Sequence, residues 1–176
     1  MHPYEHILSD GTALRVRLAA SGDGALFAQG FSELSVGSIR DRFHSANFRP
    51  TPAQLDYLTD VDQENHLAVC AGTMEGGLEH GVGVARCIRV GTGDTAELAV
   101  TVIDDYQRRG IASLLMMALA QLAAANDIRF FTALVMAERR DLLRHLYRVC
   151  ARPARVRSGV AEIIIPVSRL LTPGSV

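Results

Sequence analysis

One stretch of the sequence decides the fold: Val102-Ile-Asp-Asp-Tyr-Gln-Arg-Arg-Gly-Ile-Ala-Ser-Leu-Leu115. Before it, residues 96–103 alternate between two sets of side chains, which is typical of a strand with one buried face. After it, apolar residues recur at steps of three and four and predict one face of a helix: Ile111, Leu114, Leu115, Ala118, Leu119 and Leu122. The stretch therefore predicts a strand, a sharp polar turn and a helix in direct succession.

The predicted turn has the chemistry of an anion-binding site. The first N–H groups of a helix have no intrahelical partner, and the helix dipole adds positive potential there. Gly110 allows close approach of the backbone to a ligand, and Arg108 and Arg109 add two cations with bidentate donors. Such a surface suits two or more linked phosphates. The turn has neither the spacing of a Walker loop nor the three glycines of a dinucleotide fingerprint.

The segment Gln107-Arg-Arg-Gly-Ile-Ala112 resembles motif A of the GNAT superfamily of N-acetyltransferases, whose pattern is Gln/Arg-x-x-Gly-x-Gly/Ala. The alternative is an ordinary strand–turn–helix connection. The resemblance implies that acetyl-CoA is the co-substrate and that main-chain groups at the strand end bind its pantetheine arm. The implied contact residues are Thr101, Val102, Ile103, Gln107, Arg108, Arg109, Gly110, Ile111, Ala112 and Ser113, together with Arg139 near a later helix start.

Two residues are candidates for the chemistry of acyl transfer. Glu97 shares its predicted strand face with Ala99 and Thr101, opposite Leu98, and its place resembles that of the general base in GNAT enzymes. The alternative for Glu97 is a solvated or salt-bridged glutamate at a strand end. Tyr147 lies in a Leu-Tyr-x-x-x-Ala pattern that resembles the family's Leu-Tyr-x-x-x-Gly, which implies a general acid. Its alternative is a tyrosine that anchors its helix in the core and keeps its hydroxyl at the surface.

Composition limits the class of protein. The chain has 176 residues, enough for one domain with a substantial core, and its 48% hydrophobic content excludes general disorder. The net charge of −1 gives no overall attraction to nucleic acid or membranes. No apolar run nears the roughly 20 residues of a membrane span, and the N-terminus lacks a signal-peptide pattern, so we expect a cytoplasmic protein. The oligomeric state stays open, a homodimer included.

The cysteines and histidines predict no metal site. Cys70, Cys87 and Cys150 are widely spaced among apolar residues, which favours buried, inert thiols over a disulfide framework. A nucleophilic Cys150 is the alternative. The histidines show no ligand spacing, so we expect no bound metal.

The remaining elements are predicted from periodicity and capping residues. Further strands are expected over residues 13–18, 66–73, 81–90, 130–136 and 160–167. Further helices are expected over residues 25–34, 35–44 and 139–149, with another beginning at Thr51-Pro52. This order suits one domain with a core over residues 13–167, a tail over about 170–176 and mobility from Thr172. The expected fold class is α/β (α+β): a single mixed, mostly antiparallel sheet with helices on both faces, as in GNAT proteins.

The N-terminal half of the sequence indicates which class of acceptor to expect. Residues 9–18, 32–43 and 51–62 resemble the acetyltransferase domain of bacterial protein lysine acetyltransferases. This resemblance implies direct attack by a protein lysine in a ternary complex, with a small amine as the alternative acceptor. The acidic loop Glu75–Glu79 would suit a cationic acceptor through electrostatic steering. A non-catalytic acyl-CoA-binding sensor is the second function that the residues leave open.

Overall fold

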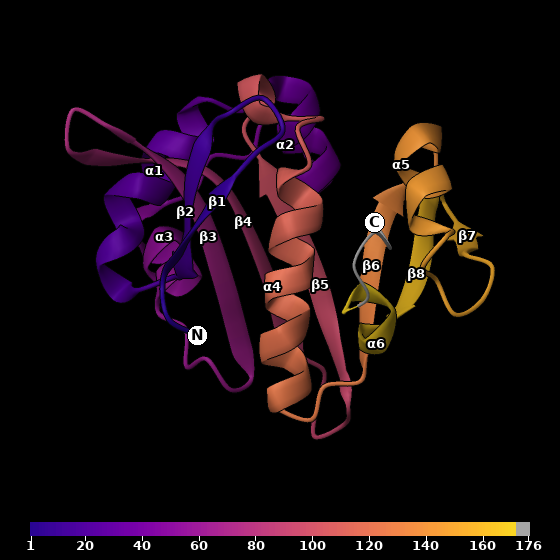
Figure 1. The fold of residues 1–176 in the computed structure, drawn as a ribbon. Helices are drawn as coiled ribbons and strands as arrows, with labels where there is room; N and C mark the ends of the chain where they lie inside the picture. Colours follow the sequence, from indigo (N-terminus) through magenta and orange to yellow (C-terminus); the bar gives the residue numbers. More distant parts are fainter. Residues whose placement is uncertain (172–176) are drawn as a thin grey trace.

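Eight strands form a single sheet in a computed structural model that describes residues 1–171 (Figure 1). The strand order is β1-β2-β3-β4-β5-β6-β8-β7, and only the β5–β6 pair is parallel. The strands are β1 (Tyr4–Ile7), β2 (Ala13–Leu18), β3 (His66–Glu75), β4 (Leu78–Arg89), β5 (Thr95–Val102), β6 (Phe130–Met136), β7 (Arg155–Arg157) and β8 (Val160–Pro166). The tail predicted from Thr172 lies outside the described residues.

Helices cover both faces of this sheet. They are α1 (Gly24–Ser32), α2 (Val36–Phe43), α3 (Pro52–Thr59), α4 (Ile111–Ala125), α5 (Arg140–Leu146) and α6 (Val167–Leu170). Capping explains two of the starts: the Ser35 hydroxyl accepts a hydrogen bond from the Ser38 N–H, and the Thr51 hydroxyl accepts one from the Gln54 N–H. The predicted fold class, a mixed and mostly antiparallel sheet with helices on both faces, is confirmed.

Alternation along the strands separates the two faces. On β3, Leu67 and Val69 belong to the core under α4, whereas Ala68 and Cys70 belong to a second cluster with Phe27 of α1. β5 follows the predicted alternation, with Leu98 and its alternate residues in the α4 core and Ala99 and Thr101 on the face of α1 and α2. Helix α1 approaches β4 closely at Gly81, where an added Cβ would lie 2.9 Å from Leu26 Cγ.

Pairing between β5 and β6 stops early. The parallel ladder joins Thr95–Glu97 to Phe130–Thr132, and beyond it β6 stays paired with β8 over its full length. Figure 1 shows β5 and β6 diverging from this point toward α2 and α5. Among the described residues, the backbone groups of residues 98–102 that face β6 therefore have no ladder partner on β6. The two strands thus splay apart, which the sequence does not reveal.

Three elements were not predicted: β1, β7 and α6. β1 and β7 consist largely of exposed residues at the two edges of the sheet, so no buried face marks them in the sequence. α6 buries Val167 and Leu170, so the folded core extends beyond residue 167. Within residues 1–171, no helix is long and apolar enough to cross a membrane.

The cysteines are buried, as predicted. Cys70, Cys87 and Cys150 are free thiols inside the core. Burial raises the pKa of Cys70 and of Cys87 to about 12, which keeps both thiols protonated at neutral pH.

Candidate active site

The turn between β5 and α4 presents a row of unused backbone donors. Arg108 and Gly110 both adopt left-handed backbone conformations, with φ of +59° and +86°. Gly110 is the N-cap of α4, a long and largely buried helix. Within residues 1–171, no group accepts a hydrogen bond from the N–H groups of residues 108–113. Donors at a helix N-terminus can bind an anion, and successive donors can bind linked phosphates.

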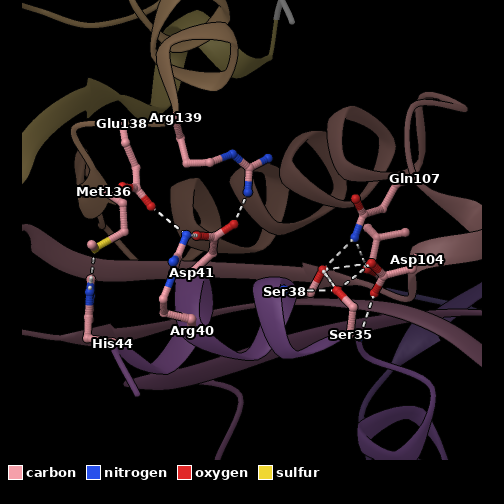
Figure 2. Close-up of polar contacts among 11 residues, drawn as sticks. Ser35, Ser38, Arg40, Asp41, His44, Asp104, Gln107, Met136, Glu138 and Arg139 are labelled. Atoms are coloured by element: carbon pink, nitrogen blue, oxygen red, sulfur yellow. Dashed lines mark hydrogen bonds and ion pairs between the residues drawn. The ribbon is translucent and has the colours of Figure 1, made fainter. Parts of the chain in front are cut away.

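Side chains of the turn fasten it to helix α2 (Figure 2). Gln107 Nε2 donates hydrogen bonds to the Val102 carbonyl, at 3.1 Å, and to Ser38 Oγ, at 3.0 Å. The Asp104 carboxylate accepts hydrogen bonds from the Ser35 N–H at 2.9 Å and the Ser35 hydroxyl at 2.7 Å. Asp104 therefore supports the start of α2 rather than the helix that follows it in sequence.

Arg109 pairs with a carboxylate of the protein, whereas the sequence suggested a phosphate as its partner. Its guanidinium pairs with Asp10 in the β1–β2 turn at 2.7 Å, donates to the Thr12 hydroxyl, and lies 4.7 Å from the ring centre of Tyr106. Hydrogen bonds from Thr12, and then from Arg109, lower the pKa of Asp10 to about 2. Arg109 thus holds two turns together, and Arg108, which is exposed, is the arginine left open to solvent.

The strand end over residues 101–103 is only partly open. The Ile103 N–H donates to the Val82 carbonyl at 3.0 Å, and the Val102 carbonyl accepts from Gln107. The unpaired backbone expected at this strand end lies instead along the edge of β5 that faces β6, beginning after Glu97. An extended ligand could bind there by adding to the sheet edge.

Glu97 lies at the point where β5 and β6 separate. Its side chain is exposed and forms no hydrogen bond or ion pair with another described residue. It borders a hollow together with Ala99 and three arginines, Arg42, Arg86 and Arg89. The arrangement leaves the Glu97 carboxylate accessible to a ligand on the face that carries α1 and α2.

An apolar cavity adjoins that hollow between α1, α2 and strands β4 and β5. Arg42, Arg86 and Ala99 line both spaces. The other large side chains of the cavity are Leu26, Phe27, Phe31, Leu34, Phe43, Leu58 and Ile103. Sequence reasoning missed the two arginines. One signal was available, because Arg86 interrupts residues 81–88, which otherwise carry no polar side chain, and buried strands rarely contain an arginine.

Contacts across the splay join α2 to the segment between β6 and α5 (Figure 2). Arg139 pairs with Asp41, and Arg40 pairs with Glu138 at 2.5 Å. His44 adds a contact to β6, with its Nδ1 3.3 Å from Met136 Sδ. The guanidinium of Arg139, expected to bind a phosphate, is thus engaged with a carboxylate of α2.

Tyr147 follows the last residue of α5. The residue is 47% exposed, so its hydroxyl can reach solvent in either of the two roles expected from the sequence. Its N–H donates to the Leu143 carbonyl, so the helix fixes its backbone while the ring lies at the surface.

The splayed sheet and the donor-rich turn at the start of α4 define the class of protein. The chain belongs to the acetyltransferase (GNAT) family, whose model matches residues 35–151. It is 35% identical over 154 residues to the acetyltransferase Pat of Mycolicibacterium smegmatis, covering 86% of this chain and 45% of that protein. It is also 32% identical over 122 residues to the acetyltransferase PA5475 of Pseudomonas aeruginosa, covering 69% of this chain and 66% of that protein.

A solved structure agrees with this assignment at the level of the fold. The GNAT domain of S. lividans PAT superposes with a TM-score of 0.83 at 24% identity, covering 93% of this chain and 96% of that one. The chain spans less than half of the M. smegmatis relative and about two thirds of the P. aeruginosa one.

Proposed function

We propose that the chain transfers the acetyl group of acetyl-CoA to a primary amine, and that the acceptor is a protein lysine. The observation that carries the proposal is the row of unpartnered N–H groups at residues 108–113, beside a strand edge that opens immediately after Glu97. The two features suit the two ends of acetyl-CoA, because the turn offers donors to phosphates and the edge offers backbone groups to an extended arm.

The co-substrate fits the residues present. The N–H groups of residues 108–113 would hold its diphosphate, with exposed Arg108 adding positive charge. The edge of β5 facing β6 would hold the pantetheine arm and bring the thioester close to Glu97. Acetyl-CoA supplies an activated acetyl group, and the protein supplies position, a proton acceptor and donors to the carbonyl oxygen.

Converting the acceptor ammonium into an amide removes two protons from its nitrogen, and the departing sulfur gains one. Glu97, directly or through a water, accepts a proton from the acceptor ammonium. The free amine attacks the thioester carbonyl carbon and the new C–N bond forms. As the C–S bond breaks, the nitrogen loses its second proton, which replaces the proton that the departing sulfur takes from its acid. Tyr147 is the residue we assign to protonate the sulfur that leaves. Both residues hold these roles by their match to the family pattern, and the accessibility of Glu97 supports its role.

The choice of a protein lysine rests on similarity in the N-terminal half and on the 35% identity to an acetyltransferase. A polyamine acceptor is less well supported. The acidic loop that could attract it is partly neutralised, because Glu79 pairs with Arg17 and Glu75 lies 3.3 Å from His80. The cavity beside Glu97 is instead lined by two arginines.

Calorimetry and a transfer assay test the proposal together. We expect acetyl-CoA to bind in the micromolar range, about −8 kcal/mol, and lysine peptides to be acetylated. Glu97→Gln should retain binding and lose transfer, whereas Glu162→Gln, an exposed glutamate on β8, should change neither. Binding without transfer by the wild type to any amine would support the sensor instead. Absence of binding would refute both functions.

A further inference from the structure

Three arginines line the hollow beside the candidate base, and none of them pairs with a carboxylate of the described residues. The guanidinium of Arg89 is occupied by hydrogen bonds to Asn65 Oδ1 and to the carbonyls of Gly93 and Asn126. The other two are less well satisfied. Arg86 is only 4% exposed; its Nη2 donates to the Leu58 carbonyl, but its Nη1 is buried with no hydrogen-bond partner among the described residues. Arg42 is half-buried, with its guanidinium 4.7 Å from the ring centre of Phe43, and it forms no ion pair within residues 1–171. Buried guanidinium groups are normally paired, because desolvating an unpaired charge is costly.

The strand register places this pair next to Glu97. In the β4–β5 ladder, Arg86 lies opposite Ala99, and Ile88 lies opposite Glu97. Alternate residues of a strand share a face, so Arg86 and Glu97 lie on the same face of the sheet as diagonal neighbours on adjacent strands. Arg42 reaches the same hollow from α2. Arg42, Arg86 and the proposed base Glu97 therefore border one space, which Arg89 also lines.

The electrostatic balance of this space is positive. Glu97 contributes one negative charge, which stabilises the charged form of Arg42. Burial, and then the charge of Arg42, lower the pKa of Arg86 to about 10. Burial, and then the charge of Arg86, lower the pKa of the nearby His66. An anion placed between the two guanidinium groups would therefore be attracted by both.

We propose that the hollow between Arg42 and Arg86 binds a carboxylate of the acceptor and so directs the acceptor amine to Glu97. The inference deepens the proposed function and rests on it. Guanidinium groups match carboxylates in charge and in bidentate geometry, and Arg42 and Arg86 both line the hollow without a carboxylate partner among the described residues. The carboxylate comes either from the α-carboxyl group of a terminal lysine or from an acidic side chain next to the target lysine.

Matched acceptors separate these two sources. One pair is Nα-acetyl-lysine and its amide, which differ only in the α-carboxylate. The other pair is a blocked tetrapeptide with Glu after the lysine and the same peptide with Gln. In at least one pair, the kcat/KM of the wild type should be at least about tenfold higher for the acceptor with the carboxylate than for the neutral acceptor. The reason is that the neutral acceptor cannot form the charged hydrogen bonds. Equal kcat/KM values within both pairs would overturn the proposal.

Variants show whether the two arginines cause the preference. Arg42→Met and Arg86→Met should reduce the preference to about one. Arg157→Met, an exposed arginine on β7, should preserve it. If circular dichroism shows that Arg86→Met is unfolded, the preference of Arg42→Met for the charged acceptor decides the question. Arg86→Lys then replaces Arg86→Met, since it keeps the positive charge. A preference that survives in Arg42→Met at the wild-type level would contradict the inference.

A binding measurement distinguishes failure of this inference from failure of the proposed function. The same matched compounds are titrated into CoA-loaded protein by calorimetry. Carboxylate-dependent binding that needs Arg42, without any acetylation, would refute the transfer activity and retain the carboxylate site. Acetylation of both members of each pair at equal rates would retain the activity and refute the site.

Discussion

Asp104 and Ser35, which are 69 residues apart in sequence, share two hydrogen bonds, at 2.9 Å to the N–H of Ser35 and 2.7 Å to its hydroxyl. The first residue lies in the turn before α4 and the second is the N-cap of α2. The pair therefore joins the turn proposed to bind phosphates to the helix that carries Arg42. Hydrogen bonds from Ser35 and Ser38 outweigh the effect of burial and keep the pKa of Asp104 low, so the carboxylate is charged at neutral pH.

Asp104→Ala should lower the free energy of unfolding by about 1–2 kcal/mol, because it removes hydrogen bonds to a charged group that supports a helix start. Urea denaturation measures the change. Asp105→Ala, at the exposed neighbouring position, should stay within about 0.5 kcal/mol of the wild type. Equal effects of the two substitutions would show that the contact with α2 adds no stability.

Gly110→Ala should weaken acetyl-CoA binding about tenfold or more. Its φ of +86° strains any L side chain, and relief of that strain would reorient the N–H groups of the turn. Gly159→Ala is the matched control, because Gly159 has a φ of +78° in the β7–β8 hairpin and open space around it. Both variants should lose about 1 kcal/mol of stability. Only the first should lose affinity in calorimetry, and the same affinity loss in both would point to general destabilisation.

His80 should make the stability depend on pH near neutrality. Its Nε2 lies 2.8 Å from Glu33, and although burial opposes protonation, the hydrogen bond and charge of Glu33 raise the pKa of His80. The folded state thus binds the proton more tightly than the unfolded state, whose histidine pKa is about 6.5. The stabilisation is complete below that pH and is lost as pH rises through the raised pKa.

The stabilisation by the His80–Glu33 pair should be about 0.5–1 kcal/mol, since the pair is partly exposed. Urea denaturation at several pH values measures it. His80→Gln should remove this component, and His2→Gln, at an exposed position, should retain it. A difference in stability between the wild type and His80→Gln that rises between pH 6.5 and 8 would have the wrong sign for this pair.

Tyr147→Phe should slow transfer about 100-fold with little change in acetyl-CoA affinity, in the range expected for loss of a general acid. Steady-state kinetics and calorimetry measure the two quantities. Tyr57→Phe, at another exposed tyrosine, serves as the control. Unchanged kcat in Tyr147→Phe would remove this residue from the chemistry, and the thiolate would then leave without protonation by it.

The parts of the fold that periodicity predicts are those with a buried face. The stretch from β5 to α4 and the bounds of β6 follow the expected pattern, because their apolar side chains recur at the strand or helix period and are buried. β1 and β7 escaped prediction for the opposite reason, since edge strands with exposed side chains leave no periodic signal.

The candidate site was predictable where one segment supplies all its groups. The N–H groups of residues 108–113 belong to one turn, and a local pattern suffices to find them. The partners of Arg109 and Arg139 lie in distant segments, at Asp10 and Asp41, so sequence spacing could not reveal that these guanidinium groups are already engaged. The Arg42–Arg86 pair is likewise assembled from a helix and a strand.

Helix α2 contacts both proposed ligand sites. Its N-terminal end is fastened to the phosphate turn through Ser35, and Arg42 near its other end lines the hollow beside Glu97. A ligand that immobilises this short helix from one side lowers the entropy cost of binding on the other. By thermodynamic linkage, we expect acetyl-CoA and the acceptor to raise each other's affinity by the same factor. Helix α2, which contacts both sites, would be the source of this cooperative binding.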